Sequence, residues 1–343
     1  MDGTGASRRM FLRSAALAGL GVALKDLLRP APLAAQGAVT HWDGSPLGRV
    51  LQNKMTVYSE PAWGSRPTGD YFYWNDIVPV LEAVVGDGLY STNDTWLRVE
   101  TGYIYSSWVQ PCSDQPNNPS VPIGEGGAWG VVTVPITWTR TAPADDAPTR
   151  QRMYYNTVHR LMALENDYYL VEETYGYRYW IKAAHVRIVP PEEMSPLSSH
   201  VPPEEKRVEV SIYEQRLYAY EGEQVVFSSH VSTGQPRTPT PLGEFRVHLK
   251  RPGQRMIGGQ GEDFYNLAGI PWISYFTQGF AALHGTYWHN DYGRPHSAGC
   301  VNLPPEAAKW LFRWTTPAVH YWDFSTRPDP DAGQPGTRVI VRV

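Results

Sequence analysis

The sequence predicts a mainly β protein, with two small β-barrels followed by a larger, mixed but β-rich domain. Short runs of alternating apolar residues, broken by glycine, proline and asparagine, recur through residues 48–190 and are typical of small barrels. After Leu303, two prolines and an acid precede apolar residues at helical spacing, which predicts one short helix beside the twisted sheet of the last domain. The 343 residues are enough for several hydrophobic cores.

The amino terminus predicts export. Arg8 and Arg9 precede an apolar stretch from Ala15 to Leu24 and small residues near Ala35, which resembles a twin-arginine signal over residues 1–36. The apolar stretch is shorter than the roughly 20 residues that span a bilayer. We therefore expect a removable signal and a protein that works outside the cytoplasm, with membrane contact only through an uncleaved signal.

Composition limits the classes of partner. The formal net charge is −4, only 19% of the residues are charged, and there is no basic tract, which argues against nucleic acid as a partner. The two cysteines, Cys112 and Cys300, cannot build a disulfide framework. We expect no cofactor.

Two segments share a pattern of short strands. The first module, residues 48–111, has strand-like runs at 49–51, 55–58, 77–81, 96–99 and 102–105, and the second, residues 129–190, has them at 129–134, 168–171 and 179–182. Linkers rich in proline and serine are predicted at 112–128 and 191–204. Both modules end in strand pairs that resemble bacterial SH3-like modules. The resemblance implies either binding of a wall polymer or shielding of a neighbouring site, and the sequence leaves both open.

Cys300 is the centre of the predicted chemistry. A thiol attacks well only as a thiolate, and therefore needs a nearby base, oxyanion donors and preferably a helix start. His284 ends a buried-strand pattern, Gly299 allows close approach of a ligand, and the predicted helix follows Cys300. The plain alternative is a small buried cysteine near unrelated histidines.

The motifs around Cys300 resemble the catalytic domain of L,D-transpeptidases (YkuD-like). The resemblance rests on His284-Gly285, on Ser297-Ala298-Gly299-Cys300, and on Val301-Asn302. Upstream, residues 209–220 resemble the opening hairpin of these domains, and 231–234 with 238–245 resemble their second signature. The resemblance covers residues 205–343.

The resemblance implies a role for each motif residue. Cys300 would attack a peptidoglycan stem peptide, release D-Ala and form a thioester, which the amine of a second stem resolves into a 3→3 cross-link. His284 would act as base and acid, and the carbonyl of Gly285 would orient its imidazole. The backbone amides of Gly299 and Cys300 are the candidates for the oxyanion hole. Carbapenems are expected to acylate Cys300.

The remaining candidates are weaker. Ser297 is either a donor in the site or an ordinary turn residue. Candidates for substrate binding are Tyr287, Arg294, His296 and Asn302. The aromatic segment 287–292 suggests a lid over the cleft, with half-buried surface rings as the alternative. A zinc site at His284, His289 and His296 fits less well than a nucleophile, so we predict no metal.

One position departs from the family pattern. Ala298 stands where the family usually has histidine, and the ring of His296, two residues earlier in an extended segment, is a possible replacement. Three functions remain open: a transpeptidase, a carboxypeptidase or endopeptidase on the same scaffold, and a catalytically impaired wall-binding protein. We expect a monomer in the cell wall or periplasm.

Overall fold

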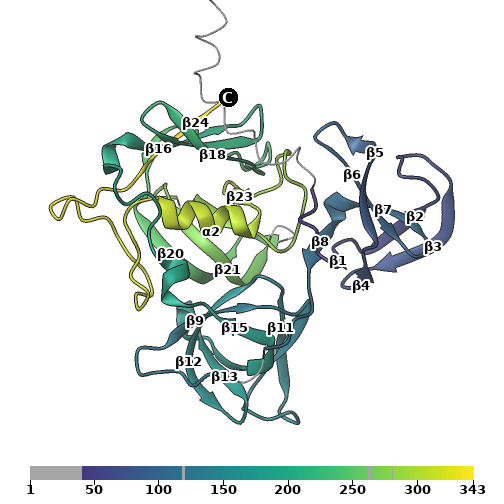
Figure 1. Cartoon of the computed structure of the whole chain (residues 1–343), viewed down its shortest axis with the longest axis horizontal. Helices are drawn as coiled ribbons and strands as arrows, with labels where there is room; N and C mark the ends of the chain where they lie inside the picture. Colours follow the sequence, from purple (N-terminus) through teal and green to yellow (C-terminus); the bar gives the residue numbers. More distant parts are fainter. Residues whose placement is uncertain (1–40, 118–119, 262–263, 280) are drawn as a thin grey trace, which may run out of the picture. The chain divides into compact units, whose positions relative to one another are not determined.

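The computed structural model describes residues 41–343 except 118–119, 262–263 and 280. The predicted export signal at residues 1–36 lies outside these residues. Within the described part, the chain is mainly β, as the sequence predicts (Figure 1). The described ranges contain no helix that is both long and apolar enough to cross a membrane.

The first module contains two sheets. One has the strand order β4-β1-β8 and the other β3-β2-β7-β6-β5. The strands are β1 (Leu47–Val50), β2 (Lys54–Tyr58), β3 (Pro67–Tyr73), β4 (Ile77–Pro79), β5 (Glu82–Tyr90), β6 (Asn93–Val99), β7 (Gly102–Tyr105) and β8 (Val109–Cys112), with the 3₁₀ helix η1 (Ser106–Trp108) before β8. Apolar residues that alternate along β2 and β6 form the core of this module, among them Met55, Val57 and Leu97.

The second module is one seven-stranded sheet with the order β11-β10-β14-β13-β12-β9-β15. Its strands are β9 (Ala128–Val132), β10 (Ile136–Arg140), β11 (Thr149–Tyr154), β12 (Val158–Glu165), β13 (Tyr168–Glu172), β14 (Arg178–Lys182) and β15 (Val186–Ile188). Short 3₁₀ helices lie at η2 (Thr174–Gly176) and η3 (Ala183–His185). The sequence analysis missed β10, β11, β12 and β15 here, and β3, β5 and β8 in the first module. Its first linker also begins inside β8, because Cys112 pairs with Leu47 of β1.

The third domain contains two sheets and one helix. The five-stranded sheet has the order β18-β17-β16-β24-β19, and the four-stranded sheet the order β20-β21-β22-β23. The elements are η4 (Pro191–Met194) and η5 (Pro203–Glu205), then β16 (Lys206–Ser211), β17 (Arg216–Glu221), β18 (Gln224–His230), β19 (Gly243–Arg246), β20 (Leu249–Gly258), β21 (Tyr265–Tyr275), β22 (Ala282–Gly285), β23 (Val301–Leu303), α2 (Pro305–Trp314) and β24 (Arg338–Arg342). The opening hairpin expected at 209–220 is β16 and β17.

Helix α2 joins the two sheets into one core. It begins with Pro305, whose fixed φ suits a first helical position, and has Glu306 in its first turn. Leu311 and Phe312 pack with residues of both sheets, such as Val208 of β16 and Leu283 of β22. Burial of each such side chain contributes about 1.5–3 kcal/mol. The helix therefore packs on β22 and β23, the two strands that carry the candidate catalytic segment.

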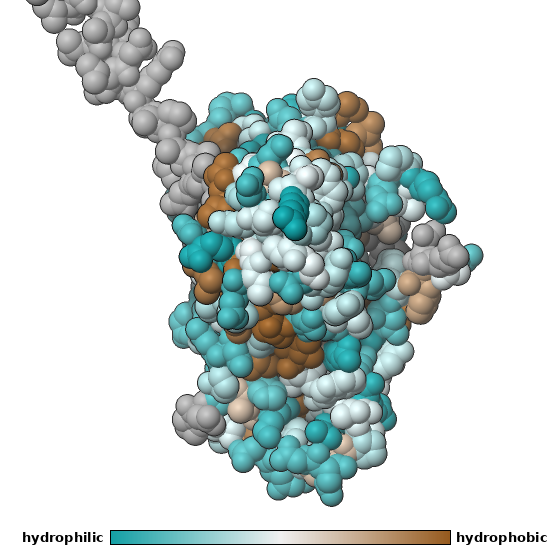
Figure 2. Space-filling view, turned by 90° about the vertical axis from the view of Figure 1, so that its right-hand side faces the viewer, coloured by the Kyte–Doolittle hydropathy of each residue, from teal (hydrophilic) through white to brown (hydrophobic). Residues whose placement is uncertain are grey.

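On the face shown in Figure 2, hydrophilic residues predominate and hydrophobic residues reach the surface in several places. In the first module, Leu81 is 53% exposed and Val85 is 72% exposed. Single exposed apolar residues are common in soluble proteins and carry no conclusion by themselves.

Candidate active site

Two parallel strands bring His284 and Cys300 onto neighbouring segments. In the pairing of β22 with β23, Leu283 lies opposite Val301 and His284 opposite Asn302. Cys300, one residue before β23, therefore comes next to Ala282, whose backbone hydrogen-bonds to the thiol. Ala282 and His284 are two residues apart and point to the same face of β22. The site thus joins a histidine and a cysteine that are 16 residues apart in the sequence.

His284 is buried and held in one tautomer. Its Nδ1 donates to the carbonyl oxygen of Gly285 at 3.0 Å, so the neutral ring has an unprotonated Nε2. Burial lowers the pKa of His284 to about 4, and the Gly285 carbonyl opposes this shift. Gly285 has no room for a side chain, because a Cβ there would lie 2.9 Å from Pro271 and 3.1 Å from Pro305. The ring is therefore neutral near pH 7 and can accept a proton at Nε2.

Cys300 is partly buried and is protonated in this state. Burial raises the pKa of its thiol to about 11, while the backbone of Ala282 acts in the opposite direction. The expectation that a helix start adjoins Cys300 and lowers its pKa is wrong. The apolar residues Val301 and Leu303 pair with β22 instead, and α2 begins only at Pro305. Activation of the thiol therefore depends on proton transfer rather than on a helix terminus.

The residues before Cys300 form a tight turn. Ser297 Oγ donates to the carbonyl of Cys300 at 2.5 Å and accepts from the amide of Gly299 at 3.1 Å. Gly299 has φ +115°, a left-handed conformation that favours glycine. Ser297 thus has the turn role that the sequence analysis left open. The amide of Gly299, a candidate oxyanion donor, is engaged by that hydroxyl, so a substrate oxyanion would have to displace it.

The second sequence signature supports this turn from the other side. The amides of His296 and Ser297 donate to the carbonyl of Thr233 at 2.9 and 3.0 Å. Thr240 Oγ1 donates to the carbonyl of Cys300 at 3.4 Å and accepts from the amide of Gly234 at 2.8 Å. Residues 231–245 therefore determine the backbone of the nucleophile turn.

The segment between His284 and Cys300 is mostly interior. Tyr287 is 4% exposed, stacks on Tyr154 and donates its hydroxyl to the carbonyl of Ala268 at 2.9 Å. Tyr292 is also buried, so these rings do not form the exposed lid that the sequence suggested. Trp288 lies near the base, with its ring centroid 5.9 Å from that of His284.

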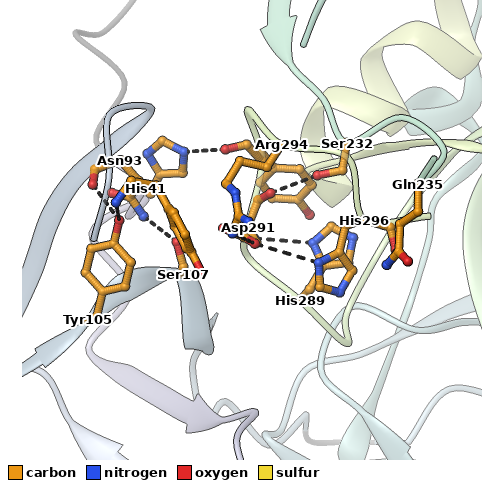
Figure 3. A network of polar contacts seen from close by, with 12 residues as sticks. His41, Asn93, Tyr105, Ser107, Ser232, Gln235, His289, Asp291, Arg294 and His296 are labelled. Carbon is orange, nitrogen blue, oxygen red and sulfur yellow. Dashed lines mark hydrogen bonds and ion pairs between the residues drawn. The ribbon is translucent and has the colours of Figure 1, made fainter. Parts of the chain in front are cut away.

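The other binding candidates are held by a polar network (Figure 3). Asp291 pairs with Arg294 at 2.9 Å and with His296 Nδ1 at 3.7 Å. The ring of His296 lies 4.3 Å from that of His289, which contacts the amide of Asn302 at 2.9 Å. Asn302 is 1% exposed, whereas Ala298 is exposed. His296 is thus engaged with Asp291 and His289, and its suggested part in replacing a histidine at 298 stays a prediction.

The first module and His41, which precedes it, contact this same segment. The sequence analysis left open that the modules shield a neighbouring site, but no motif indicated these contacts. His41, labelled in Figure 3, donates from Nε2 to the carbonyl of Tyr292 at 2.8 Å. Asn290 donates to the carbonyl of His41 at 2.7 Å. The guanidinium of Arg294 lies 3.3 Å from the ring centre of Tyr90. These contacts join residues about 200 or more apart in the sequence, and no local pattern indicates them.

A buried charge completes this interface. Arg49, on β1, is 2% exposed and donates to the carbonyl of Tyr287 at 2.5 Å. Its other donors reach Gln110 at 2.7 Å and Asn75 at 2.8 Å. The segment that connects base and nucleophile is therefore held by a charged side chain of another module.

The hairpin of β20 and β21 forms an apolar wall beside Cys300. The thiol packs with a cluster of hydrophobic residues drawn largely from this hairpin and its neighbours. The cluster contains Leu249, Met256, Leu267, Ile270, Ile273, Tyr275, Ala282, Tyr287 and Trp288. This apolar wall is the physical cause of the raised thiol pKa. Within the described ranges, histidine, cysteine, aspartate and glutamate side chains form no group of three that suits a metal ion.

One known protein family matches part of the chain. Residues 205–341 match the YkuD family, the L,D-transpeptidase catalytic domain. This part of the chain is therefore a YkuD-type L,D-transpeptidase catalytic domain. No curated protein sequence matches the chain.

Several solved structures are similar to part of the chain. An L,D-transpeptidase from Mycobacterium smegmatis is 23% identical over 40% of this chain and 59% of its own, with a TM-score of 0.33. A mutant of the Enterococcus faecium L,D-transpeptidase is 24% identical over 40% of this chain and 50% of its own, with a TM-score of 0.32. An L,D-transpeptidase from Mycobacterium tuberculosis is 18% identical over 55% of this chain and 73% of its own, with a TM-score of 0.30. The chain thus spans less than two thirds of the first two structures.

Proposed function

We propose that this protein is a peptidoglycan L,D-transpeptidase that forms 3→3 cross-links through a thioester on Cys300. The observation that carries the proposal is a neutral, oriented His284 on the strand beside the cysteine, with Nε2 free to accept a proton. The YkuD match over residues 205–341 supports the same reaction class. We also propose that the protein is exported to the cell wall or periplasm, that its first two modules are SH3-like, and that it is a monomer.

The first half-reaction forms the thioester. His284 Nε2 takes the proton of the Cys300 thiol as the sulfur attacks the carbonyl of the third stem residue, and a C–S bond forms. The C–N bond to D-Ala then breaks, and the imidazolium gives its proton to the leaving amine. A neutral thiol and a neutral imidazole suit this order, because the thiolate is needed only while substrate is bound.

The second half-reaction resolves the thioester. The side-chain amine of a second stem attacks the same carbonyl and His284 accepts its proton. The C–S bond then breaks, and the imidazolium gives this proton to the leaving sulfur, which restores the thiol. The amide of Cys300 is a candidate donor to both oxyanions, and that of Gly299 becomes one once Ser297 Oγ moves aside. Water in place of the amine gives a carboxypeptidase on the same site.

Intact-mass analysis of wild-type protein and Cys300→Ala tests the proposal. Each is incubated with a disaccharide-tetrapeptide and, separately, with a carbapenem. We expect an adduct on wild type alone, together with a dimeric 3→3 product. Release of tripeptide without a dimer would identify a hydrolase, and absence of any adduct would leave a wall-binding protein.

A further inference from the structure

An arginine of the second module lies over two half-exposed tryptophans. The guanidinium carbon of Arg152, on β11, is 4.8 Å from the ring centre of Trp138 on β10 and 5.5 Å from that of Trp74. Trp138 lies directly opposite Arg152 in the antiparallel pair, whereas Trp74 follows β3 of the first module. One cation therefore contacts indole rings of two modules, within the distance of about 6 Å at which such pairs attract.

Side chains of β10 and β11 alternate between the core and an outer face. Thr139 and Met153 are buried, and Met153 packs in the core of the second module. Since neighbouring side chains of a strand point to opposite faces, Trp138 and Arg152 lie on the outer face. Arg150, two residues before Arg152, is exposed on the same face.

A third indole lies on the next strand of this face. Trp180 of β14 is partly buried and stands between the core residues Tyr179 and Ile181, so it lies on the outer face. It pairs with Arg140, which is two residues after Trp138 on β10. Diagonal neighbours of this kind are about 7–8 Å apart, within reach of aromatic side chains. The tryptophan–arginine surface consists of Trp74, Trp138, Trp180, Arg150 and Arg152.

The two tryptophans over Arg152 are too exposed for a contact that only packs the modules together. Trp74 is 50% exposed and Trp138 is 43% exposed, whereas Trp129 on β9 is completely buried. A ring that stays half in water loses much of the stabilisation that burial of an aromatic side chain provides. Rings that are held in place but left open are expected of a binding surface.

The charge of this surface is positive. Within the described residues, neither Arg150 nor Arg152 forms an ion pair, and Arg150 donates to a backbone oxygen, the carbonyl of Arg178, at 3.3 Å. Glu172, on the outer face of β13, is already paired with Arg178 at 2.9 Å. Because the whole chain has a formal net charge of −4, the positive charge of this surface is a local feature. It favours a ligand with negative groups.

The surface is close to the segment between base and nucleophile. Tyr154 follows Arg152 by two residues on the outer face of β11, and its ring stacks on that of Tyr287 with the centroids 5.5 Å apart. At about 3.4 Å per residue, Arg152 and Tyr154 lie about 7 Å apart along the strand. A ligand on the surface is therefore near the catalytic segment.

A buried ion pair fixes the second module to the hairpin of β20 and β21. The carboxylate of Glu173, which follows β13, accepts from Arg255 Nε of β20 at 2.6 Å, and both side chains are buried. Arg255 also donates from Nη1 to Asn266 of β21 at 2.7 Å. Such a pair resists displacement of the module along the hairpin. The surface and the catalytic domain are thus held together.

We propose that the tryptophan–arginine surface binds the glycan strands of peptidoglycan, with sugar rings on the indoles and stem carboxylates on Arg150 and Arg152. The choice of this polymer rests on the proposed function. Sugar rings have apolar C–H faces and polar edges, which suit half-exposed indoles that adjoin cations. Arginine binds a carboxylate through two parallel hydrogen bonds. The two modules thus hold the polymer while the catalytic domain acts on its stems.

Co-sedimentation with purified sacculi, freed of phosphate-containing polymers, tests the proposal. All proteins carry Cys300→Ala, so pelleting measures binding without chemistry, and Tm reports folding. Trp138→Ala should raise Kd about fivefold, as expected for the loss of one aromatic contact, and Trp138→Phe should stay within about twofold of the parent. Trp74→Ala repeats the test at a ring outside the second module. Arg152→Gln should raise Kd at low salt and have a smaller effect at high salt, which screens charges.

Three controls complete the test. Trp322→Ala removes a tryptophan that is 60% exposed in the third domain, and it should bind as the parent does. Glycan strands whose stems an amidase has removed should keep the effect of Trp138→Ala and lose that of Arg152→Gln. Vesicles of phosphatidylcholine and phosphatidylglycerol should not pellet the protein.

Three results overturn the proposal. They are an unchanged Kd in both Trp74→Ala and Trp138→Ala, an equal loss of binding in Trp322→Ala, and pelleting by the vesicles that the same substitutions abolish. An effect of Arg152→Gln that persists without stems overturns the role given to the carboxylates.

The experiment distinguishes this inference from the proposed function, because binding by Cys300→Ala proteins needs no acyl-enzyme. If wild type forms no adduct with a carbapenem or a tetrapeptide, the transpeptidase proposal fails, but weaker pelleting of Trp138→Ala still supports the binding surface. If wild type forms the adduct and all variants pellet equally, the transpeptidase proposal stands and the binding surface is overturned.

Discussion

Replacing Arg49 with methionine should destabilise the protein and slow acylation of Cys300. The guanidinium makes three hydrogen bonds, to Gln110, Asn75 and the carbonyl of Tyr287. It also lies 4.0 Å from the ring centre of Tyr154. Methionine keeps much of the apolar volume and removes every donor, so the change isolates the polar contribution.

The size of the effect follows from two opposing contributions. Hydrogen bonds from a charged donor contribute about 1.5–3 kcal/mol each, or about 4.5–9 kcal/mol for three. Burial lowers the pKa of Arg49 from 12.5 to about 10, which at about 1.4 kcal/mol per pKa unit is about 3 kcal/mol against the charged form. The side chain is still charged at pH 7, and its net contribution is then about 1.5–6 kcal/mol. We expect Arg49→Met to lower the free energy of unfolding by about 3 kcal/mol.

The matched control is Arg98→Met in the same module. The side chain of Arg98 is 42% exposed and pairs with Glu82 at 3.2 Å, a surface contact that contributes about 0–1 kcal/mol. Urea unfolding followed by tryptophan fluorescence compares both variants with wild type. Carbapenem acylation, followed by mass, should slow about tenfold in Arg49→Met, because the segment that it holds positions base and nucleophile. The reasoning is refuted if the free energies of unfolding of Arg49→Met and Arg98→Met differ by less than about 1 kcal/mol and Arg49→Met is acylated at the wild-type rate.

The remaining predictions concern helix α2 and the thiol. Lys250 is 1% exposed and its Nζ donates to the carbonyls of Phe312, Thr315 and Pro317, so Lys250→Met should cost about 3 kcal/mol in urea unfolding. Lys182→Met, at a side chain that is 41% exposed, should cost under about 1 kcal/mol, and equal losses would contradict this. Because the thiol pKa of Cys300 is raised to about 11, its peptide-resolved alkylation by iodoacetamide should rise about tenfold per pH unit from pH 7 to 9, and a plateau there would indicate a resting thiolate.

The sequence indicates the chemistry that we propose for the site because short motifs carry it. His284-Gly285 and Ser297 to Cys300 are local patterns, and the helix after them shows prolines, an acid and apolar spacing within ten residues. The strand β23 was not predicted, because three residues are too few for a periodic signal. Because β23 pairs with β22, the three residues of this strand lie between Cys300 and the residues that lead into α2. The raised pKa of the thiol then follows from burial.

Strands were missed where burial is weak or glycine interrupts the pattern. In β3 (Pro67–Tyr73), six of seven residues are exposed, so no alternation marks the strand. In β5 (Glu82–Tyr90), Gly86 and Gly88 break the run, although backbone pairing with β6 continues on either side of an irregularity. Whether such segments form strands depends on their pairing with neighbouring strands, and a single sequence does not show that pairing.

The positions of the candidate binding residues could not be predicted from local sequence either, because contacts with residues distant in the sequence determine them. Tyr287 reads as an aromatic loop residue, and only contact with Tyr154 and Ala268 makes it interior. The sequence marks Arg49 and Glu173 as ordinary polar residues of small β modules. Their partners, Tyr287 and Arg255, lie 238 and 82 residues away.

Buried charge at both module contacts bears on how the catalytic segment works. Arg49 and the Glu173–Arg255 pair are almost fully buried. Separating the modules from the catalytic domain would take the Tyr287 carbonyl away from Arg49 and would divide the Glu173–Arg255 pair. Breaking a buried pair typically costs about 3–5 kcal/mol, whereas apolar contacts tolerate sliding. Buried charged contacts of this kind therefore favour a single arrangement of the contacting segments. The first module therefore fixes the segment between base and nucleophile, and the second fixes the hairpin that covers the thiol, so both walls of the site depend on residues outside the catalytic domain.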